Sequence, residues 1–153
     1  MKAVIQRVED ASVTVDGVVK GGINEGLLVY LGVALEDGEN DAEWLAEKTV
    51  HLRIFDDVDG KMNLSLKEIT DCGAEAGVLA VSQFTLLADA RKGRRPTWNG
   101  AAPSESAKKL YEFFIAKVRE RGITCESGEF QSYMKVTYTN DGPVTILLDS
   151  KEI

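Results

Sequence analysis

The chain has 153 residues, of which 44% are hydrophobic and 28% are charged, and its 18 Lys and Arg residues against 25 Asp and Glu residues give a formal net charge of −7. This profile predicts one compact domain over residues 1–153 and argues against two linked domains. Because no run of about 18 uncharged apolar residues occurs and a polar break follows the first apolar residues, we expect no membrane segment and no signal peptide, and therefore a cytoplasmic protein.

The first third of the chain carries strand and turn signals followed by one helix signal. The patterns predict a strand over Lys2–Val8, a hairpin over Ser12–Val19 that turns at Asp16-Gly17, and a buried strand over Gly26–Val33. From Asn40 to Leu52 the apolar residues recur at helical spacing, and Asn40 with Glu43 resembles a capping box. We therefore expect the first main helix there.

The acidic segment after this helix resembles a calcium-binding loop without meeting its requirements. Placing Gly60 at loop position 6 puts Phe55 at position 1 and Leu66 at position 12, where the calcium loop needs acidic ligands. We therefore predict an acidic turn with Asp59-Gly60 at its tip.

A second buried strand and a long irregular segment follow. Val78–Phe84 is apolar with a polar end, and Ala88–Pro103 has no clear periodicity, which is typical of a binding loop. Within this loop four cations fall in five positions: Arg91, Lys92, Arg94 and Arg95. On these residues alone, both an anion site and a solvated basic loop remain open.

The last third predicts one strong helix and three strands. The helix is expected over Ser104–Gly122, with Ser104 as N-cap and Gly122 as the stop. Strands are expected over Ile123–Cys125, Met134–Tyr138 and Val144–Leu148, and a turn between the last two at Asn140-Asp141-Gly142-Pro143.

These elements predict the fold class. About seven strands and two helices without a repeating βαβ rhythm favour an α+β fold, mainly an antiparallel β-sheet or barrel with two main helices packed outside. Several long apolar strands in so small a domain also predict that a second subunit closes a sheet edge or face. We expect a homodimer.

The chain lacks the residues of most familiar catalytic sites. His51 is the only imidazole and lies inside the predicted first helix, while Cys72 and Cys125 have no C-x-x-C spacing. We therefore expect no metal and no cofactor, and catalysis would rest on positioning, backbone donors or a group of the substrate. The two candidate segments are Ser82-Gln83-Phe84-Thr85-Leu86 and Gly142-Pro143, although strand-end polarity and a simple tight turn would also explain them.

Four segments in order carry a resemblance over the whole chain: Ala3-Val4-Ile5-Gln6-Arg7-Val8, Gly60-Lys61-Met62-Asn63, Ser82-Gln83-Phe84-Thr85-Leu86 and Asn140-Asp141-Gly142-Pro143-Val144-Thr145. With them the chain resembles the D-aminoacyl-tRNA deacylase family, formerly called D-tyrosyl-tRNA deacylases. The resemblance implies a cytoplasmic homodimer that hydrolyses the ester between a D-amino acid and the 3′-terminal adenosine of tRNA. It also implies action on glycine mischarged to alanine tRNA.

The resemblance further implies roles for individual residues. Ser82, Gln83, Phe84 and Thr85 would line the pocket for the aminoacylated adenosine, and Gly142-Pro143, in cis, would enter the active site of the opposite subunit. Arg7 matches an arginine thought to hold that motif. Thr85 has been considered a nucleophile in this family, whereas another view assigns the activation of water to the ribose 2′-OH of the substrate. Because Thr85 has no base nearby in the sequence, we favour the second view.

The resemblance also gives the basic loop a partner. Arg91, Lys92, Arg94 and Arg95 would contact acceptor-stem phosphates of aminoacyl-tRNA, which supplies affinity without sequence preference. Trp98 is open to two interpretations, stacking on a base or ordinary packing. Two other classes remain: an RNA-binding module without chemistry, and an interaction protein whose dimer is its function.

Overall fold

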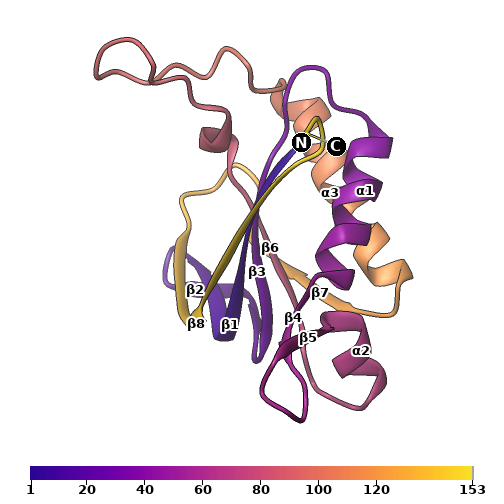
Figure 1. The fold of residues 1–153 in the computed structure, drawn as a ribbon. Helices are drawn as coiled ribbons and strands as arrows, with labels where there is room; N and C mark the ends of the chain where they lie inside the picture. Colours follow the sequence, from indigo (N-terminus) through magenta and orange to yellow (C-terminus); the bar gives the residue numbers. More distant parts are fainter. Residues whose placement is uncertain (153) are drawn as a thin grey trace.

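The computed structural model describes residues 1–152, and its strands and helices follow one another as shown in Figure 1. In chain order they are β1 (Lys2–Val15), β2 (Val18–Ile23), β3 (Gly26–Gly32), α1 (Glu39–His51), β4 (Arg53–Asp56), β5 (Met62–Ser65), α2 (Leu66–Asp71), β6 (Gly77–Ser82), the 3₁₀ turn η1 (Phe84–Leu87), α3 (Ser104–Glu120), β7 (Thr124–Ser127) and β8 (Lys135–Asp149). The predicted α+β class is confirmed. No helix within residues 1–152 is both long and apolar enough to cross a membrane.

The main sheet is mixed: antiparallel ladders on β1 are combined with two parallel ladders that the sequence did not predict. β1 pairs antiparallel with β8 along one edge and with β3 and β2 along the other. β3 and β6 are parallel, and so are β6 and β7. The parallel pairs arise because helices connect these strands: α3 carries the chain from β6 back to the start of β7, which is a single βαβ unit.

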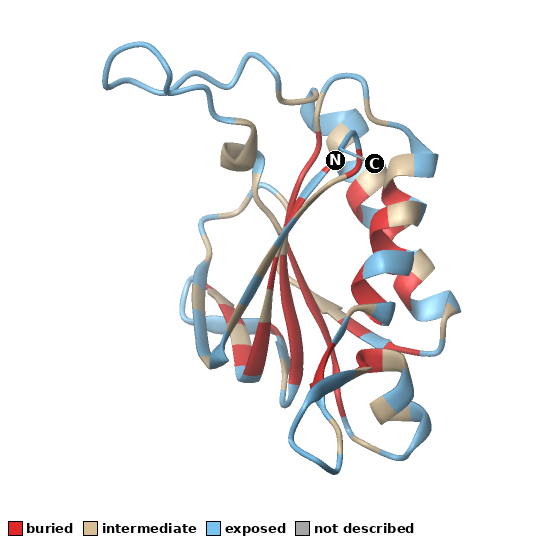
Figure 2. Cartoon of the chain, in the orientation of Figure 1, coloured by how far each residue is buried: buried red, intermediate tan, exposed pale blue. Residues whose placement is uncertain are grey.

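Both faces of the central strands are buried, which explains their continuous apolar sequence. In β3, Leu27 and Val29 pack with the helices α1 and α3, which lie on the same side of the sheet in Figure 1. Leu28 faces the other way and packs with Val13 and Leu79 in a second cluster on the opposite face of the sheet. Figure 2 shows this burial as red strands and red inner faces of the helices.

One long strand replaces an expected turn. The prediction that Asn140-Asp141-Gly142-Pro143 reverses the chain between two strands is wrong, because β8 runs through it and stays paired with β1 on both sides. Val8 pairs with Asn140 and Gln6 with Thr145, so four residues of β8 lie opposite Arg7 alone. Turn-forming residues therefore build a bulge here, a feature that such residues also favour.

Other boundaries differ in smaller ways. The two expected strands over 2–8 and 12–15 are the single strand β1, and the short helix α2 and the hairpin β4–β5 were not predicted as such. The Asp59-Gly60 turn is confirmed: it joins β4 to β5, with Gly60 at φ +71°.

The expected helix caps are partly wrong. α1 begins after Gly38, whose N–H donates to the Asp41 carboxylate at 2.8 Å, so Asn40 and Glu43 form no capping box. Pro103 is the N-cap of α3, and Ser104 is its first helical residue. Gly122 follows the end of α3 with φ +77°, as its prediction as a stop requires.

Candidate active site

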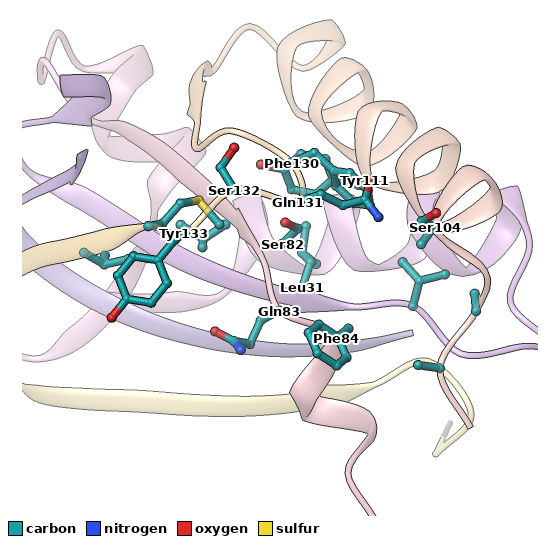
Figure 3. Close-up of a pocket in the computed structure, with 17 residues that line it drawn as sticks. Leu31, Ser82, Gln83, Phe84, Ser104, Tyr111, Phe130, Gln131, Ser132 and Tyr133 are labelled. Carbon is teal, nitrogen blue, oxygen red and sulfur yellow. The ribbon is translucent and has the colours of Figure 1, made fainter. Parts of the chain in front are cut away.

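The candidate active site is a pocket of about 540 Å³ at the carboxyl end of β6. Its walls come from β3, β6, the start of α3 and the irregular segment before β8, as Figure 3 shows. Most lining side chains are apolar, with a few polar groups among them: Ser82, Gln83, Ser104, Tyr111, Gln131, Ser132 and Tyr133. Such a pocket suits a ligand with an apolar body and a few polar groups.

The strand end positions three of the predicted residues on this pocket. The Gln83 N–H donates to the Leu31 carbonyl at 2.7 Å, and the chain then turns into η1. Ser82, Gln83 and Phe84 thereby line the cavity together (Figure 3). Within residues 1–152 the N–H groups of Phe84 and Thr85 have no hydrogen-bond acceptor, so two backbone donors are available beside the pocket.

Thr85 stands apart from its neighbours. It does not line the pocket, and its hydroxyl accepts a hydrogen bond from the Gln83 side-chain amide. Across the described residues no carboxylate, imidazole or amine contacts this hydroxyl. The hydroxyl therefore has no base to remove its proton.

Among residues 1–152, no carboxylate, amine, guanidinium, imidazole or thiol side chain lines the pocket. The described lining includes two phenols, those of Tyr111 and Tyr133. Burial holds the pKa of Tyr111 well above its ordinary value, and its phenol donates to the Ala80 carbonyl at 2.8 Å. His51 lies at the exposed end of α1, outside the pocket.

Gly142 and Pro143 are joined by a cis peptide bond and lie in the middle of β8, away from the carboxyl end of β6. Ser82 is in register with Leu31 and, through it, with Ala3, whereas the bulge lies opposite Arg7. The two segments are separated by four residues along β1, which span about 14 Å, and by three strand spacings across the sheet, which also span about 14 Å. A single chain therefore does not bring its two predicted site segments together.

Arg7 is buried beneath the bulge and held from several sides. Its Nη1 donates to the Ile54 carbonyl at 2.6 Å and lies 3.6 Å from Asp56 Oδ1. Its Nε lies 2.7 Å from Asp141 Oδ2, an ion pair rather than an aligned hydrogen bond, since this nitrogen has no hydrogen-bond partner. A Cβ built on Gly142 would be 3.3 Å from Arg7 Nη2, so the guanidinium packs directly against the motif.

The basic loop forms an arm that projects from the body of the protein (Figure 1). Asp89 and Thr97 bridge its two sides through hydrogen bonds of 2.8 and 3.0 Å, and the four cations lie beyond this bridge. Arg91 pairs with Asp89 at 2.6 Å and lowers the pKa of that carboxyl. Lys92, Arg94 and Arg95 have no ion-pair partner within the part of the chain that the structure describes.

Part of this arrangement could not be predicted from the sequence. Residues 130–133 line the pocket, but their lack of periodicity predicts no element, and Met134, which also lines it, is predicted only as the start of a strand. Tyr111 lies within the helix predicted over residues 104–122, and helical spacing alone does not indicate that it borders a pocket. Asp56 and Asp141 contact Arg7 through the fold alone, and only the position of Asp141 inside a recognised motif could have pointed to it.

Comparison with known proteins supplies the context for this geometry. The sequence profile of the family described as D-Tyr-tRNA(Tyr) deacylase matches residues 4–149. A D-aminoacyl-tRNA deacylase of Koribacter versatilis is 57% identical over 152 residues, covering 99% of each chain, and that of Thermosipho melanesiensis is 55% identical over 154 residues, covering 100% of this chain and 99% of the relative.

Solved structures agree on the fold. The structure titled c-Myc DNA Unwinding Element Binding Protein has a TM-score of 0.88 and 39% identity, with 97% of this chain and 98% of that chain covered. A probable eukaryotic D-amino acid tRNA deacylase superposes with a TM-score of 0.82 at 18% identity, covering 96% of this chain and 97% of that one. The second likeness concerns the fold alone.

Proposed function

Since the chain belongs to the D-Tyr-tRNA(Tyr) deacylase family and is thereby a hydrolase of D-aminoacyl-tRNA, we propose that its pocket holds the aminoacylated 3′-terminal adenosine. The observation that carries this proposal is the pocket at the end of β6. It combines apolar walls with backbone donors, and within residues 1–152 no carboxylate, imidazole or amine side chain lines it. We place this activity in the cytoplasm, where tRNA is aminoacylated.

The proposed reaction uses a group of the substrate as its proton carrier. Water attacks the ester carbonyl carbon, the bond to the ribose 3′-oxygen breaks, and the neighbouring 2′-OH passes the water proton to that leaving oxygen. The free N–H groups of Phe84 and Thr85 would stabilise the negative charge on the carbonyl oxygen. Thr85 and Gln83 hold the turn that presents these donors, and Ser82 and Phe84 border the substrate.

The active enzyme is proposed to be a homodimer. Gly142 and Pro143 lie far from the pocket of their own chain, so only a second subunit can bring them to it. An exposed sheet face supports this assembly: Val4 and Leu147 are cross-strand neighbours on the side of β1 and β8 away from the helices, and Leu147 is 73% exposed.

Selectivity for D over L is proposed to come from exclusion. An enzyme that accepts many side chains cannot bind each one, but it can fix the amino and carbonyl groups and place rigid backbone where an L side chain would project. Gly142-Pro143 of the partner would be that backbone, and Arg7 would hold it in place. Glycine has no side chain to exclude, so glycine mischarged to alanine tRNA would also be hydrolysed.

The basic arm is proposed to bind the acceptor stem of tRNA. Lys92, Arg94 and Arg95 are free to contact phosphates, while Arg91 would exchange its pairing with Asp89 for one with the backbone. Such contacts do not depend on sequence, which suits an enzyme that serves many tRNAs.

One assay tests the activity and separates it from its alternatives. D- and L-aminoacyl-tRNA are incubated with enzyme far below the substrate concentration, and release of the amino acid is followed. We expect multiple turnovers for the D form alone. Binding without turnover would instead indicate an RNA-binding module, and neither binding nor turnover an interaction protein.

Mixed dimers test the site between subunits. Ala107→Trp should fill the pocket, and Gly142→Ala should displace the motif, so each homodimer is expected to lose most of its activity. In the mixed dimer, the intact pocket of one subunit meets the intact motif of the other, and one site in two should recover. No recovery, in mixtures shown by mass spectrometry to contain mixed dimers, would contradict the proposal.

A further inference from the structure

Two exposed aromatic rings lie next to each other at the mouth of the pocket. The ring centroids of Phe84 and Trp98 are 5.7 Å apart, with their planes inclined by 61°. Phe84 is 59% exposed and lines the pocket, whereas Trp98 is 41% exposed and lies outside it. A tryptophan whose only role is packing would be expected to have most of its surface buried against other residues.

The backbone around Trp98 is anchored on both sides. On one side lies the bridge between Asp89 and Thr97, and on the other Ala101 bridges to Ala34 while the Ala102 N–H donates to the Val33 carbonyl at 2.9 Å. The Ala101 N–H also donates to the carbonyl of Trp98 at 2.9 Å. Trp98 is therefore held at the base of the arm rather than on its projecting tip.

We propose that Trp98 is a stacking platform for the base of the nucleotide that precedes the terminal adenosine. The inference rests on the proposed function and adds a subsite to it. The order of features from the pocket outward matches the order of groups along the 3′ end of tRNA: the pocket with Phe84, then Trp98, then the cations of the arm. The 5.7 Å between the rings allows adjacent nucleotides to contact one ring each.

Stacking fits the demands on such a subsite. A base that stacks on an aromatic side chain gains affinity without sequence readout, because every base has a π face. An exposed ring that is fixed before binding loses little conformational freedom on doing so. Trp98 would thus orient the strand that enters the pocket, while the cations of the arm supply long-range attraction.

The test compares Trp98→Ala with Trp98→Phe on two kinds of substrate. Against a hairpin RNA that carries the acceptor stem and its single-stranded 3′ end, Trp98→Ala should raise Kd by roughly 5- to 150-fold, the equivalent of one lost base stack. Trp98→Phe should stay within about threefold of wild type, since a phenyl ring still stacks. Hydrolysis of D-aminoacyl-adenosine, which lacks the preceding nucleotide, should be unchanged in both variants.

A second comparison removes the base instead of the ring. A hairpin RNA with an abasic site before the terminal adenosine should bind wild type as weakly as the intact RNA binds Trp98→Ala. In the variant, the abasic site should cause no further loss, because both changes remove the same contact. If the fold-changes in Kd caused by Trp98→Ala and by the abasic site multiply when the two are combined, the proposal is overturned. An unchanged Kd for Trp98→Ala would overturn it as well.

These outcomes are separate from those of the proposed function. If Trp98 merely supports Phe84, the Trp98→Ala variant should lose the same factor on D-aminoacyl-adenosine as on D-aminoacyl-tRNA, which contradicts stacking. A wild-type enzyme without turnover on D-aminoacyl-tRNA would refute the deacylase assignment, whereas the RNA-binding comparison would still decide whether a base stacks on Trp98.

Discussion

The side chain of Asn140 is hydrogen-bonded to the backbone of Arg7, 133 residues earlier in the chain. Its amide nitrogen donates to the Arg7 carbonyl at 2.9 Å and to the Val144 carbonyl at 3.1 Å. One side chain therefore ties β8 to β1 and also closes the bulge that carries Gly142 and Pro143. The position of this motif depends on Asn140 as well as on the guanidinium of Arg7.

Replacing Asn140 with Asp should loosen the bulge. A carboxylate cannot donate to the two carbonyl oxygens and would repel them, so we expect the free energy of unfolding to fall by about 1–3 kcal/mol. We also expect kcat/KM for D-aminoacyl-tRNA to fall, measured beside urea unfolding. Asn24→Asp, at an exposed position, adds the same charge elsewhere and should change neither quantity by much. If Asn24→Asp lowers the free energy of unfolding and kcat/KM as much as Asn140→Asp does, Asn140 does not hold the bulge as proposed.

Gly142→Ala should cost activity. Gly142 has φ +112°, and an added Cβ would lie 2.9 Å from Val144 Cγ2 and 3.3 Å from Arg7 Nη2. We expect a fall in kcat/KM of at least about tenfold on both D-aminoacyl- and glycyl-tRNA, since backbone strain and displacement of the motif act on either substrate. Gly73→Ala is the matched control, because Gly73 also has a positive φ, +98°, but open space around its Cβ. The activity of Gly73→Ala should match that of wild type, although its positive φ also costs some stability.

Thr85→Ala should retain substantial activity. The Thr85 hydroxyl has no base nearby and is held by Gln83, so it is expected to support the turn rather than attack the ester. A tRNA that ends in 2′-deoxyadenosine should be hydrolysed very slowly by wild type, because the proposed proton carrier is missing. A loss of about 10⁴-fold or more in kcat for a folded, dimeric Thr85→Ala would favour a nucleophilic threonine instead.

Charge reversal at the arm should change the salt dependence of tRNA binding. Replacing Arg94 and Arg95 with Glu should raise KM and flatten the plot of log Kd against log salt, by about 0.9 per lost phosphate contact if the acceptor stem behaves as B-DNA does. Lys108→Glu with Lys109→Glu makes the same charge change on α3, where Glu112 and Glu105 already pair with these lysines. That control should leave the slope unaltered. An unaltered slope in the arm variant would contradict the proposal that Arg94 and Arg95 contact tRNA phosphates.

The two cysteines should differ in reactivity. Burial raises the pKa of Cys125 to about 12, whereas Cys72 is exposed. Because the thiolate is the reacting form, an aromatic disulfide reagent at pH 8 should modify one thiol per native chain, and none in Cys72→Ser. Both thiols should react in urea. Rapid reaction of two thiols in the native protein would contradict the burial of Cys125.

Local pattern was sufficient for the elements whose signal is short in range. The apolar runs that became β3 and β6, the periodicity of α1 and α3, and the turn at Gly60 could all be predicted, since burial and turn formation act on neighbouring residues. The motif Ser82–Phe84 was likewise found from the sequence, with its resemblance to a family, and it does line a pocket. The position of the basic arm between β6 and α3 also followed from its composition.

Pairing between distant segments was decided only by the tertiary structure. The turn residues Asn140–Pro143 would suit a chain reversal equally well, and it is the ladder to β1 on both sides that makes them a bulge. The parallel pairing of β3, β6 and β7, the contact of Trp98 with Phe84 and the pocket wall at Phe130 depend on loop closures that local propensity does not encode. The same holds for the separation of Gly142 from Ser82. Both motifs can be recognised along the sequence, but their separate places on one sheet follow from the register of β1 with its neighbours. That register is set by the burial of side chains contributed by the whole chain.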